Sequence, residues 1–219
     1  MSTETLSYRD MVEQLPPDSH LVLRGLSWEE YEALLQTFVE AKGLRLSYDE
    51  GRLEIMVLSA EHENYAELIK QLVGTLSLRL RIKVLHFGSA TMRKKGQSKG
   101  AEADACFYVQ SADAIGNRKQ IDFSSDPPPD IVVEVDLHHE SIAKFPIYAA
   151  LGVQEIWRYD GQTLGIYHLE KAEYVGSDAS VAFPMLTASR LTELLNRSQE
   201  ENQYEILLAF DSWLKALGT

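Results

Sequence analysis

Apolar residues recur at helical spacing in two long stretches near the start of the chain. The first helix is predicted to begin at Ser27, where Ser27 and Glu30 have the spacing of a capping box. Gly43 stands where this helix would stop. The second is predicted to begin after Ser59, a good N-cap residue. Shorter helices are predicted over residues 141–151, from residue 189, and over residues 204–217.

Alternating and continuous apolar runs predict the strands. Residues 44–48 and 53–57 alternate on either side of a turn at residues 49–51, which is typical of a hairpin. A continuous apolar run at residues 131–136 indicates a central, mostly buried strand. Further strands are predicted at residues 84–87, 104–109, 154–159 and 164–169, and near Tyr174.

The interleaving of helices and strands predicts one α/β domain over residues 1–219, with a central mixed β-sheet flanked by helices. No linker separates two halves with independent cores. Pro16 and Pro17 break any early helix, so residues 1–26 are expected to form an irregular lead-in. Residues 189–219 are expected to form a C-terminal helical extension.

The composition is that of a globular protein. The 219 residues are 45% hydrophobic and 25% charged, which excludes a fully disordered or collagen-like chain. Cys106 is the single cysteine, so there is no intrachain disulfide and no cysteine cluster for a metal. This cysteine usage leads us to expect a reducing, cytoplasmic setting. No signal peptide or membrane span is evident in the sequence.

The charge is strongly acidic overall but unevenly distributed. The chain has 21 basic and 33 acidic residues and a formal net charge of −12, which argues against a protein that coats nucleic acid. Residues 68–101, however, contain no Asp or Glu, and they include a predicted polar, basic loop at residues 93–100. This window is either a local phosphate-binding surface or a solvated helix face followed by a loop. Its candidate phosphate contacts are Arg93, Lys94, Lys95 and Lys99.

Carboxylates inside apolar strands are the most informative feature. Asp104 opens one apolar strand, Glu134 interrupts another, and Asp136 follows on the same face because side chains alternate along a strand. A buried carboxylate is costly unless it is paired or binds a metal. Oxygen donors from neighbouring strands suit Mg²⁺ or Mn²⁺. The alternatives are a strand end that reaches solvent, or a salt bridge with a nearby Lys or Arg.

Lys144 lies ten positions after Glu134, at the start of the next predicted helix. If that helix packs back across the strand end, the Lys144 ammonium reaches the carboxylates. There it can position a water molecule and offset phosphate charge. The alternative is an ordinary surface lysine.

Four segments carry a family resemblance: EADACFYV at 102–109, PDIVVEVD at 129–136, SIAK at 141–144 and YAALGVQEIWRYD at 148–160. Their order resembles that of the PD-(D/E)XK nuclease superfamily, which has the restriction-endonuclease-like fold. More narrowly, the chain is similar to a restriction-endonuclease family long catalogued as a domain of unknown function. His62 also fits, and the resemblance covers roughly residues 20–190.

The resemblance implies a nuclease that uses Mg²⁺ (or Mn²⁺) and acts on nucleic acid, DNA more than RNA. Asp104 and Glu134 would hold the ion, with the Val135 carbonyl as a further ligand, and Lys144 would be the catalytic lysine. Glu63, or less so Glu67, would join the site.

The chain departs from the superfamily pattern at one informative position. Asp136 stands where the superfamily has a lysine two residues after the glutamate. It is either a third metal ligand or a partner for Lys144. The departure leaves open a nuclease-fold protein without activity that binds nucleic acid or protein, and also a factor that acts through a partner.

A homodimer is possible, through the C-terminal helix near Trp213 or through the strand that carries Trp157. The alternative is that both tryptophans complete the core of the monomer.

Overall fold

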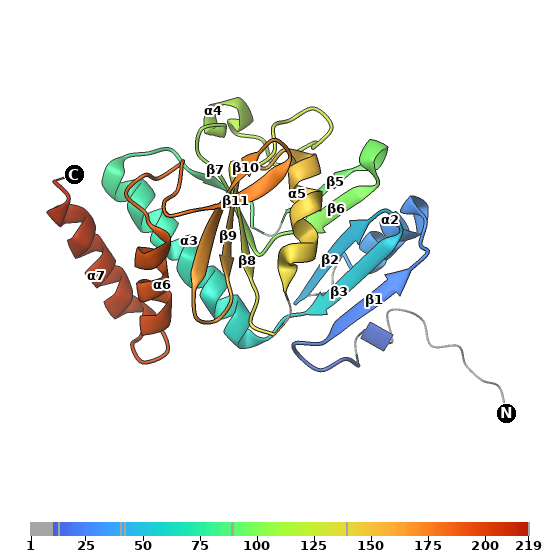
Figure 1. Ribbon diagram of the computed structural model, residues 1–219, viewed down its shortest axis with the longest axis horizontal. Coiled ribbons are helices and arrows are strands. Elements are labelled where there is room, and N and C mark those ends of the chain that lie inside the picture. The colour runs from blue at the N-terminus through green and yellow to red at the C-terminus, as the bar shows by residue number, and fades with distance from the viewer. Residues whose placement is uncertain are drawn as a thin grey trace.

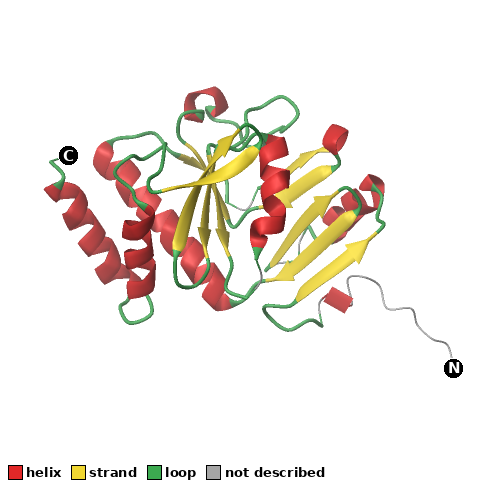
Figure 2. Ribbon diagram, in the orientation of Figure 1, coloured by secondary structure: helices red, strands yellow, loops and turns green. Residues whose placement is uncertain are grey.

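Two β-sheets with helices packed around them make up the protein (Figures 1 and 2). The computed structural model describes residues 11–218 except residues 13, 40, 42, 89 and 139, and the two sheets are those formed by these residues. No helix in the same part of the chain is long and apolar enough to cross a membrane.

The first sheet is antiparallel throughout. Its strands in spatial order are β1 (His20–Arg24), β3 (Arg52–Val57), β2 (Leu44–Asp49), β6 (Lys99–Glu102) and β5 (Thr91–Lys94). Helix α2 (Trp28–Thr37) covers this sheet, and Tyr31 of the helix stacks on Tyr48 of β2.

The second sheet is mixed, because β8 and β9 are parallel whereas its other neighbours are antiparallel. Its strands in spatial order are β11 (Glu173–Ser177), β10 (Leu164–Glu170), β9 (Glu155–Tyr159), β8 (Ile131–Val135), β7 (Ala105–Tyr108) and β4 (Leu85–His86). The predicted α/β fold with a central mixed sheet flanked by helices is confirmed. The separate five-stranded sheet is an addition to it.

Helices cover the second sheet on both faces (Figure 1). Val133 and Val135 of β8 face a core built with α3, whereas Val132 faces a core built with α5. Helix α5 also packs against β5 and β6, so it lies between the two sheets. The helices concerned are α3 (Ala60–Leu80), α6 (Ala188–Arg197) and α7 (Gln203–Ala216) on one face and α5 (Phe145–Leu151) on the other.

The N-caps that the sequence predicts at Ser27 and Ser59 are both present. The Ser27 hydroxyl accepts from the backbone N–H of Glu30, and the Glu30 carboxylate accepts from the backbone N–H of Ser27 at 2.7 Å. The Ser59 hydroxyl accepts from the backbone N–H of His62, which places His62 in the first turn of α3. These caps satisfy backbone donors that the helix itself leaves unpaired.

Two segments expected to be irregular are strands. Part of the predicted lead-in forms β1, which pairs with β3. The predicted basic loop at residues 93–100 is instead a hairpin, β5–β6, closed by the short 3₁₀ helix η1 (Lys95–Gln97) and a left-handed residue at Ser98. Polar composition suggested a loop, but pairing with β2 and burial of Met92 and Ala101 override it.

The predicted dimer interface at Trp157 is wrong. Trp157 is 0% exposed and its strand β9 pairs on both sides with β8 and β10. The residue therefore completes the core of this chain. An interface near Trp213, which stacks on Phe210 of α7 and lies under Arg190, stays a prediction.

Candidate active site

Asp104 and Glu134 lie side by side at adjacent strand ends. Ala105 of β7 is opposite Val133 of β8, so the next step of the antiparallel register brings Asp104 to Glu134. The backbone N–H of Val135 donates to Asp104 Oδ2 at 2.9 Å and fixes that carboxylate. Asp104 is 2% exposed and Glu134 1%. The sheet thus buries two acids opposite one another on neighbouring strands.

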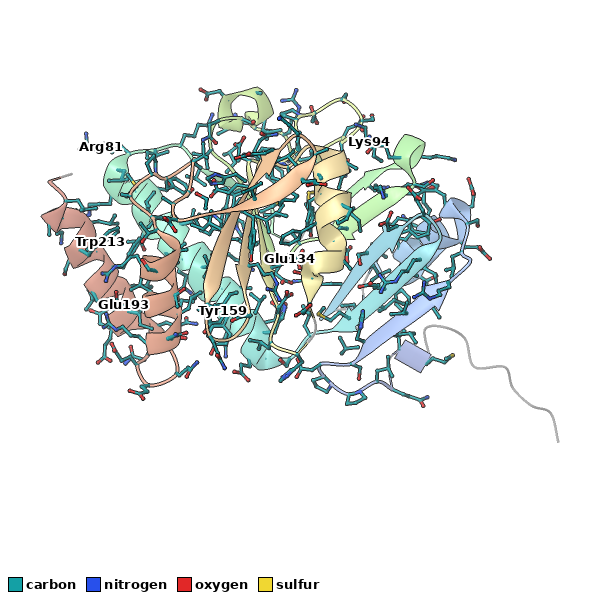
Figure 3. The ribbon with its side chains drawn as sticks, in the orientation of Figure 1. Arg81, Lys94, Glu134, Tyr159, Glu193 and Trp213 are labelled. Carbon is teal, nitrogen blue, oxygen red and sulfur yellow. The ribbon has the colours of Figure 1, made fainter. Side chains whose placement is uncertain are left out.

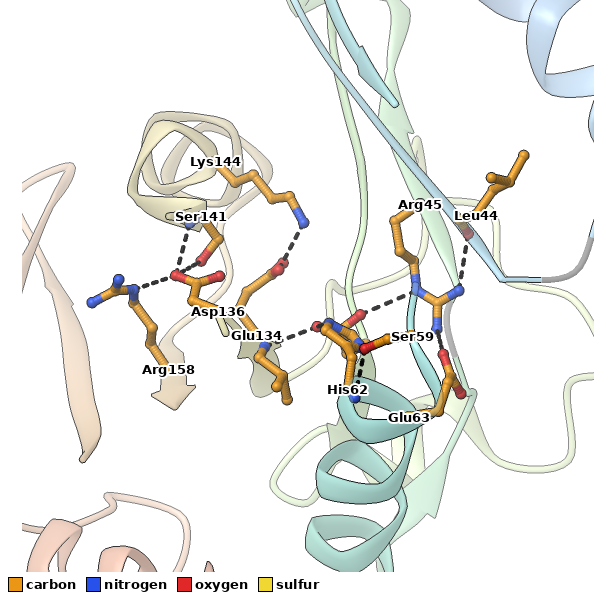
Figure 4. Close-up of polar contacts among 12 residues, drawn as sticks. Leu44, Arg45, Ser59, His62, Glu63, Glu134, Asp136, Ser141, Lys144 and Arg158 are labelled. Carbon is orange, nitrogen blue, oxygen red and sulfur yellow. Dashed lines mark hydrogen bonds and ion pairs between the residues drawn. The ribbon is translucent and has the colours of Figure 1, made fainter. Parts of the chain in front are cut away.

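Glu134 is held by two side chains from the segment that follows β8. Lys144 Nζ, at the end of the 3₁₀ helix η2 (Ser141–Lys144), donates to Glu134 Oε2 at 2.7 Å. The Tyr148 hydroxyl of α5 donates to Glu134 Oε1. Figure 4 shows Lys144 and Glu134 pointing toward one another. Lys144 is only 4% exposed, so it is not a surface lysine, and the segment does pack back across the strand end.

Asp104 is held from the other side by cationic groups. His62 Nε2, in the first turn of α3, lies 3.1 Å from Asp104 Oδ2. Arg45 Nε, on β2 of the first sheet, lies 3.2 Å from Asp104 Oδ1. Arg45 also contacts Glu63 Oε1 at 3.1 Å. Glu63 therefore reaches the acid pair through Arg45, and it is the half-exposed outer member of this network.

Asp136 shares the α5 face of β8 with Glu134 but has different partners. Its Oδ2 accepts from the backbone N–H of Ser141 at 2.7 Å and from the Ser141 hydroxyl at 2.9 Å. Arg158 of β9 is its ion-pair partner (Figure 4). The expectation that Asp136 pairs with Lys144 is wrong, because Lys144 is engaged by Glu134.

The three acids predicted as metal ligands, Asp104, Glu134 and Asp136, are not gathered into one ligand cluster. Nowhere in the described part of the chain do three or more His, Cys, Asp or Glu side chains come together in a way that could hold a metal ion. The interaction of Asp136 with Ser141 and Arg158 directs its carboxylate to the start of η2 instead.

Burial and charge shift the ionisation of the Glu134–Lys144 pair. Burial is the largest cause that raises the pKa of Glu134 to about 7, and the charges of Asp104 and Asp136 add to it against the opposing charge of Lys144. For Lys144, burial favours the neutral form, but Glu134 and Asp104 raise its pKa above the usual value. This shift favours the protonated ammonium of Lys144 at neutral pH.

The Asp104–His62 pair is shifted the opposite way. Burial opposes ionisation of Asp104, but His62, Lys144 and Arg45 together hold its pKa below the usual value. Burial likewise opposes protonation of His62, but the hydrogen bond and charge of Asp104 raise its pKa. The surrounding cations thus favour the ionised form of Asp104.

We expect the stability of the metal-free protein to fall with rising pH through Glu134. A carboxyl whose pKa rises from 4.5 to about 7 on folding stabilises the fold fully below pH 4.5. That contribution is lost as the pH passes 7, and it amounts to about 3 kcal/mol. Urea unfolding of wild type and Glu134→Gln from pH 4.5 to 8 measures it. The free energy of wild type should fall relative to the variant, and parallel curves would contradict the assignment.

An open groove of about 1590 Å³ lies beside this site, with Arg45 and Glu63 in its wall. Of the four predicted phosphate contacts, three line it, and Figure 3 marks Lys94 near the end of the β5–β6 hairpin. Lys99 does not line the groove, and its ammonium pairs with Asp49 and Glu50. Lys95 is paired with Glu29 at 3.1 Å and is mostly exposed. The basic side chains that line the groove besides Arg45 are Lys70, Arg93, Lys94, Lys95 and Lys119.

Among the residues that contact the acids, sequence reasoning missed Tyr148, Arg158 and Arg45, and also Ser141, which donates to Asp136. Tyr148 follows Lys144 by one helical turn, which is a signal that could have found it. Arg158 is opposite Glu134 in the parallel register of β8 and β9, which requires the sheet order. Arg45 occupies a polar position of an alternating strand, and nothing in the local pattern marks it.

The model of the Uma2 family, described as "Putative restriction endonuclease", matches residues 28–200. Among solved structures, the chain is similar to a crystal structure titled as a "putative nuclease belonging to DUF820" from Anabaena variabilis ATCC 29413. The identity is 17%, with 68% of this chain and 90% of that chain covered and a TM-score of 0.49. No curated protein matches.

The family match indicates the class of substrate and the class of cofactor, but not a particular nucleic acid or ion. A nuclease family implies a nucleic-acid substrate, and restriction-endonuclease-like families generally use divalent metals. The family model covers most of the chain, including Arg45, His62, Lys144 and Tyr148, which contact Asp104 or Glu134. The chain therefore belongs to the Uma2 family of restriction-endonuclease-like proteins.

Proposed function

We propose that the protein is an endonuclease that hydrolyses phosphodiester bonds of DNA with a Mg²⁺ (or Mn²⁺) ion held by Asp104 and Glu134. One observation carries the proposal: two buried carboxylates meet at adjacent strand ends, and a buried lysine lies 2.7 Å from one of them. Such a constellation is costly to bury and is a poor choice for stability alone. Carboxylates that can hold a divalent ion, with a cation that can offset phosphate charge, suit metal-dependent phosphodiester hydrolysis.

The donor set fits a hard divalent cation. Asp104 and Glu134 offer carboxylate oxygens, and the Val135 carbonyl is the proposed further ligand. Asp104 Oδ1 is buried and accepts no hydrogen bond from any residue that the structure describes, although it lies near Arg45. Asp136 is not retained as a ligand, because Ser141 and Arg158 already engage its carboxylate.

When bound, a divalent ion supplies a more acidic water and charge stabilisation at the phosphate. The side chains of the chain supply the rest of the mechanism. The Tyr148 hydroxyl holds Glu134 in one orientation, and Asp104 is held by the Val135 N–H. Lys144, which keeps its proton at neutral pH, turns its ammonium toward the phosphoryl oxygens and stabilises the charge that develops there. The basic groove side chains contact neighbouring phosphates.

A second candidate is a binding protein without nuclease activity. The observation that favours it is that Lys144, His62 and Arg45 already neutralise the two carboxylates inside the protein. In this case the groove binds nucleic acid and the carboxylates only hold the fold together.

The test combines metal binding with cleavage. Mg²⁺ and Mn²⁺ are titrated by calorimetry into wild type and Glu134→Gln, and the same proteins are assayed for nicking of a supercoiled plasmid and cleavage of an RNA duplex. We expect wild type to bind one ion and nick the plasmid, and the variant to lose both. The matched control is Glu155→Gln, which changes another buried glutamate of the same sheet that binds Trp157 and Val181 instead.

Three other outcomes have a clear meaning. Metal binding without nicking supports the binding protein. No metal binding by wild type overturns the proposed function. Cleavage of RNA but not of plasmid DNA would support the proposed nuclease activity and change its substrate from DNA to RNA.

A further inference from the structure

Arg45 reaches Asp104 from the five-stranded sheet, whereas Asp104 and Glu134 belong to the strand ends of the six-stranded sheet. Arg45 lies on β2, is only 9% exposed, and contacts Asp104 Oδ1 through Nε at 3.2 Å. Its two terminal nitrogens donate to Glu63 Oε1 at 3.1 Å and to the Leu44 carbonyl at 2.9 Å. Figure 4 shows these contacts spreading in different directions from one guanidinium.

The contacts of Arg45 connect the buried site to the groove. Asp104 lies on the buried side, whereas Glu63 is 46% exposed. Arg45, Glu63 and Leu44 all line the groove, together with the basic side chains described above. Arg45 is therefore the cation that faces both the acid pair and the surface where a phosphate backbone would lie.

A guanidinium in this position cannot be neutralised, and its planar set of donors matches either a carboxylate or a phosphate. A divalent ion at Asp104 would compete for the oxygen that Arg45 contacts and would repel the guanidinium. Glu63 and the Leu44 carbonyl would still hold the arginine at the groove wall. The donor that had faced Asp104 would then be free.

We propose that Arg45 competes with the divalent ion for Asp104 and, once displaced, binds a backbone phosphate in the groove. Arg45 thereby couples metal binding to nucleic-acid binding, and by reciprocity nucleic acid tightens metal binding. This inference rests on the proposed function and adds to it an arginine that senses whether metal is bound. A purely structural salt bridge would produce no such coupling.

The experiment uses Arg45→Gln in the full chain. Calorimetry measures Mg²⁺ affinity without nucleic acid, and anisotropy measures the binding of a labelled DNA duplex with a chelator and with Ca²⁺. We expect Arg45→Gln to bind Mg²⁺ more tightly than wild type by at least a few fold. We expect wild type to bind DNA more tightly with Ca²⁺ than with the chelator, and the variant to lose this gain. In the presence of Ca²⁺, the logarithm of the DNA association constant should depend less steeply on the logarithm of the salt concentration in Arg45→Gln than in wild type. The slope should be smaller in magnitude by about 0.9, as expected for the loss of one phosphate contact.

Two further variants make the result specific. Arg24→Gln removes an exposed arginine of the same sheet that does not line the groove, and it should leave both affinities as in wild type. Arg45→Lys keeps the charge without the planar set of donors, and it should also lose the gain with Ca²⁺. If Arg45→Gln does not fold, Arg45→Lys takes its place in the same measurements.

Unchanged Mg²⁺ affinity in Arg45→Gln, or a loss of DNA affinity that is equal with and without Ca²⁺, overturns the inference. Either result leaves the proposed function intact as long as wild type binds metal. Absence of metal binding in wild type overturns both.

Discussion

Lys144→Met is expected to destabilise the metal-free protein by about 3–5 kcal/mol at pH 8 and to abolish cleavage. Methionine nearly preserves the volume of the side chain but removes the ammonium. Glu134 is then left as a buried anion beside Asp104 and Asp136, although the Tyr148 hydroxyl still donates to it. The loss of activity follows because the proposed phosphate-stabilising charge is gone.

Urea unfolding at pH 8 and at pH 5.5 checks this expectation. The destabilisation should shrink at pH 5.5, since Glu134 then takes up a proton and no longer needs a cation. The double variant Lys144→Met with Glu134→Gln should recover part of the stability, which a double-mutant cycle measures. Lys83→Met is the control, because Lys83 pairs with Asp113 at the exposed surface. Equal effects of the two lysine variants would contradict the buried pair.

Asp136→Ala is expected to lower stability by a similar amount, about 3 kcal/mol, and to reduce cleavage while metal affinity stays within a few fold of wild type. The substitution leaves Arg158 without its carboxylate and frees the backbone N–H of Ser141. Because Ser141 begins η2 and Lys144 ends it, the lysine loses its fixed position over Glu134. The same calorimetry and plasmid assay measure both effects.

The result for Asp136→Ala separates two roles for that residue. If metal affinity disappears with cleavage, Asp136 is a ligand, as the sequence alone suggested. If metal affinity persists, Asp136 positions the lysine. Ser141→Ala should then show a weaker form of the same behaviour, with about 1 kcal/mol of stability lost, because it removes one hydroxyl donor to Asp136.

The centre of the site was predictable from the sequence because its residues violate their local pattern. Asp104 and Glu134 are acids in apolar strands, and such positions need a partner or a function. Lys144 was singled out by its position at the start of the helix predicted to follow the Glu134 strand, and the family resemblance then implied its role. What the sequence could not supply was the packing of η2 and α5 over the strand end, which depends on contacts between distant segments.

Arg45 and the β5–β6 hairpin were missed for the opposite reason. Their local sequence fits a common pattern, a solvent-facing strand position for Arg45 and a basic loop for the hairpin, and both interpretations are wrong. An arginine at a polar position of an alternating strand is expected to face solvent. Its burial follows from the approach of α3 and of the strand end at Asp104, neither of which is near it in sequence. The hairpin looks like a basic loop because its outward side chains, including Arg93 and Lys94, dominate its composition.

The Glu134–Lys144 pair joins two elements rather than two positions of one strand. What the glutamate needs is a cation within reach, and any segment that crosses this strand end can provide one. A motif search that demands a lysine two residues after the glutamate would therefore pass over this chain. A search for the spatial arrangement of carboxylates and ammonium would find it. In proteins with this arrangement, the position of the lysine in the sequence therefore cannot be inferred from the position of the strand that carries the glutamate.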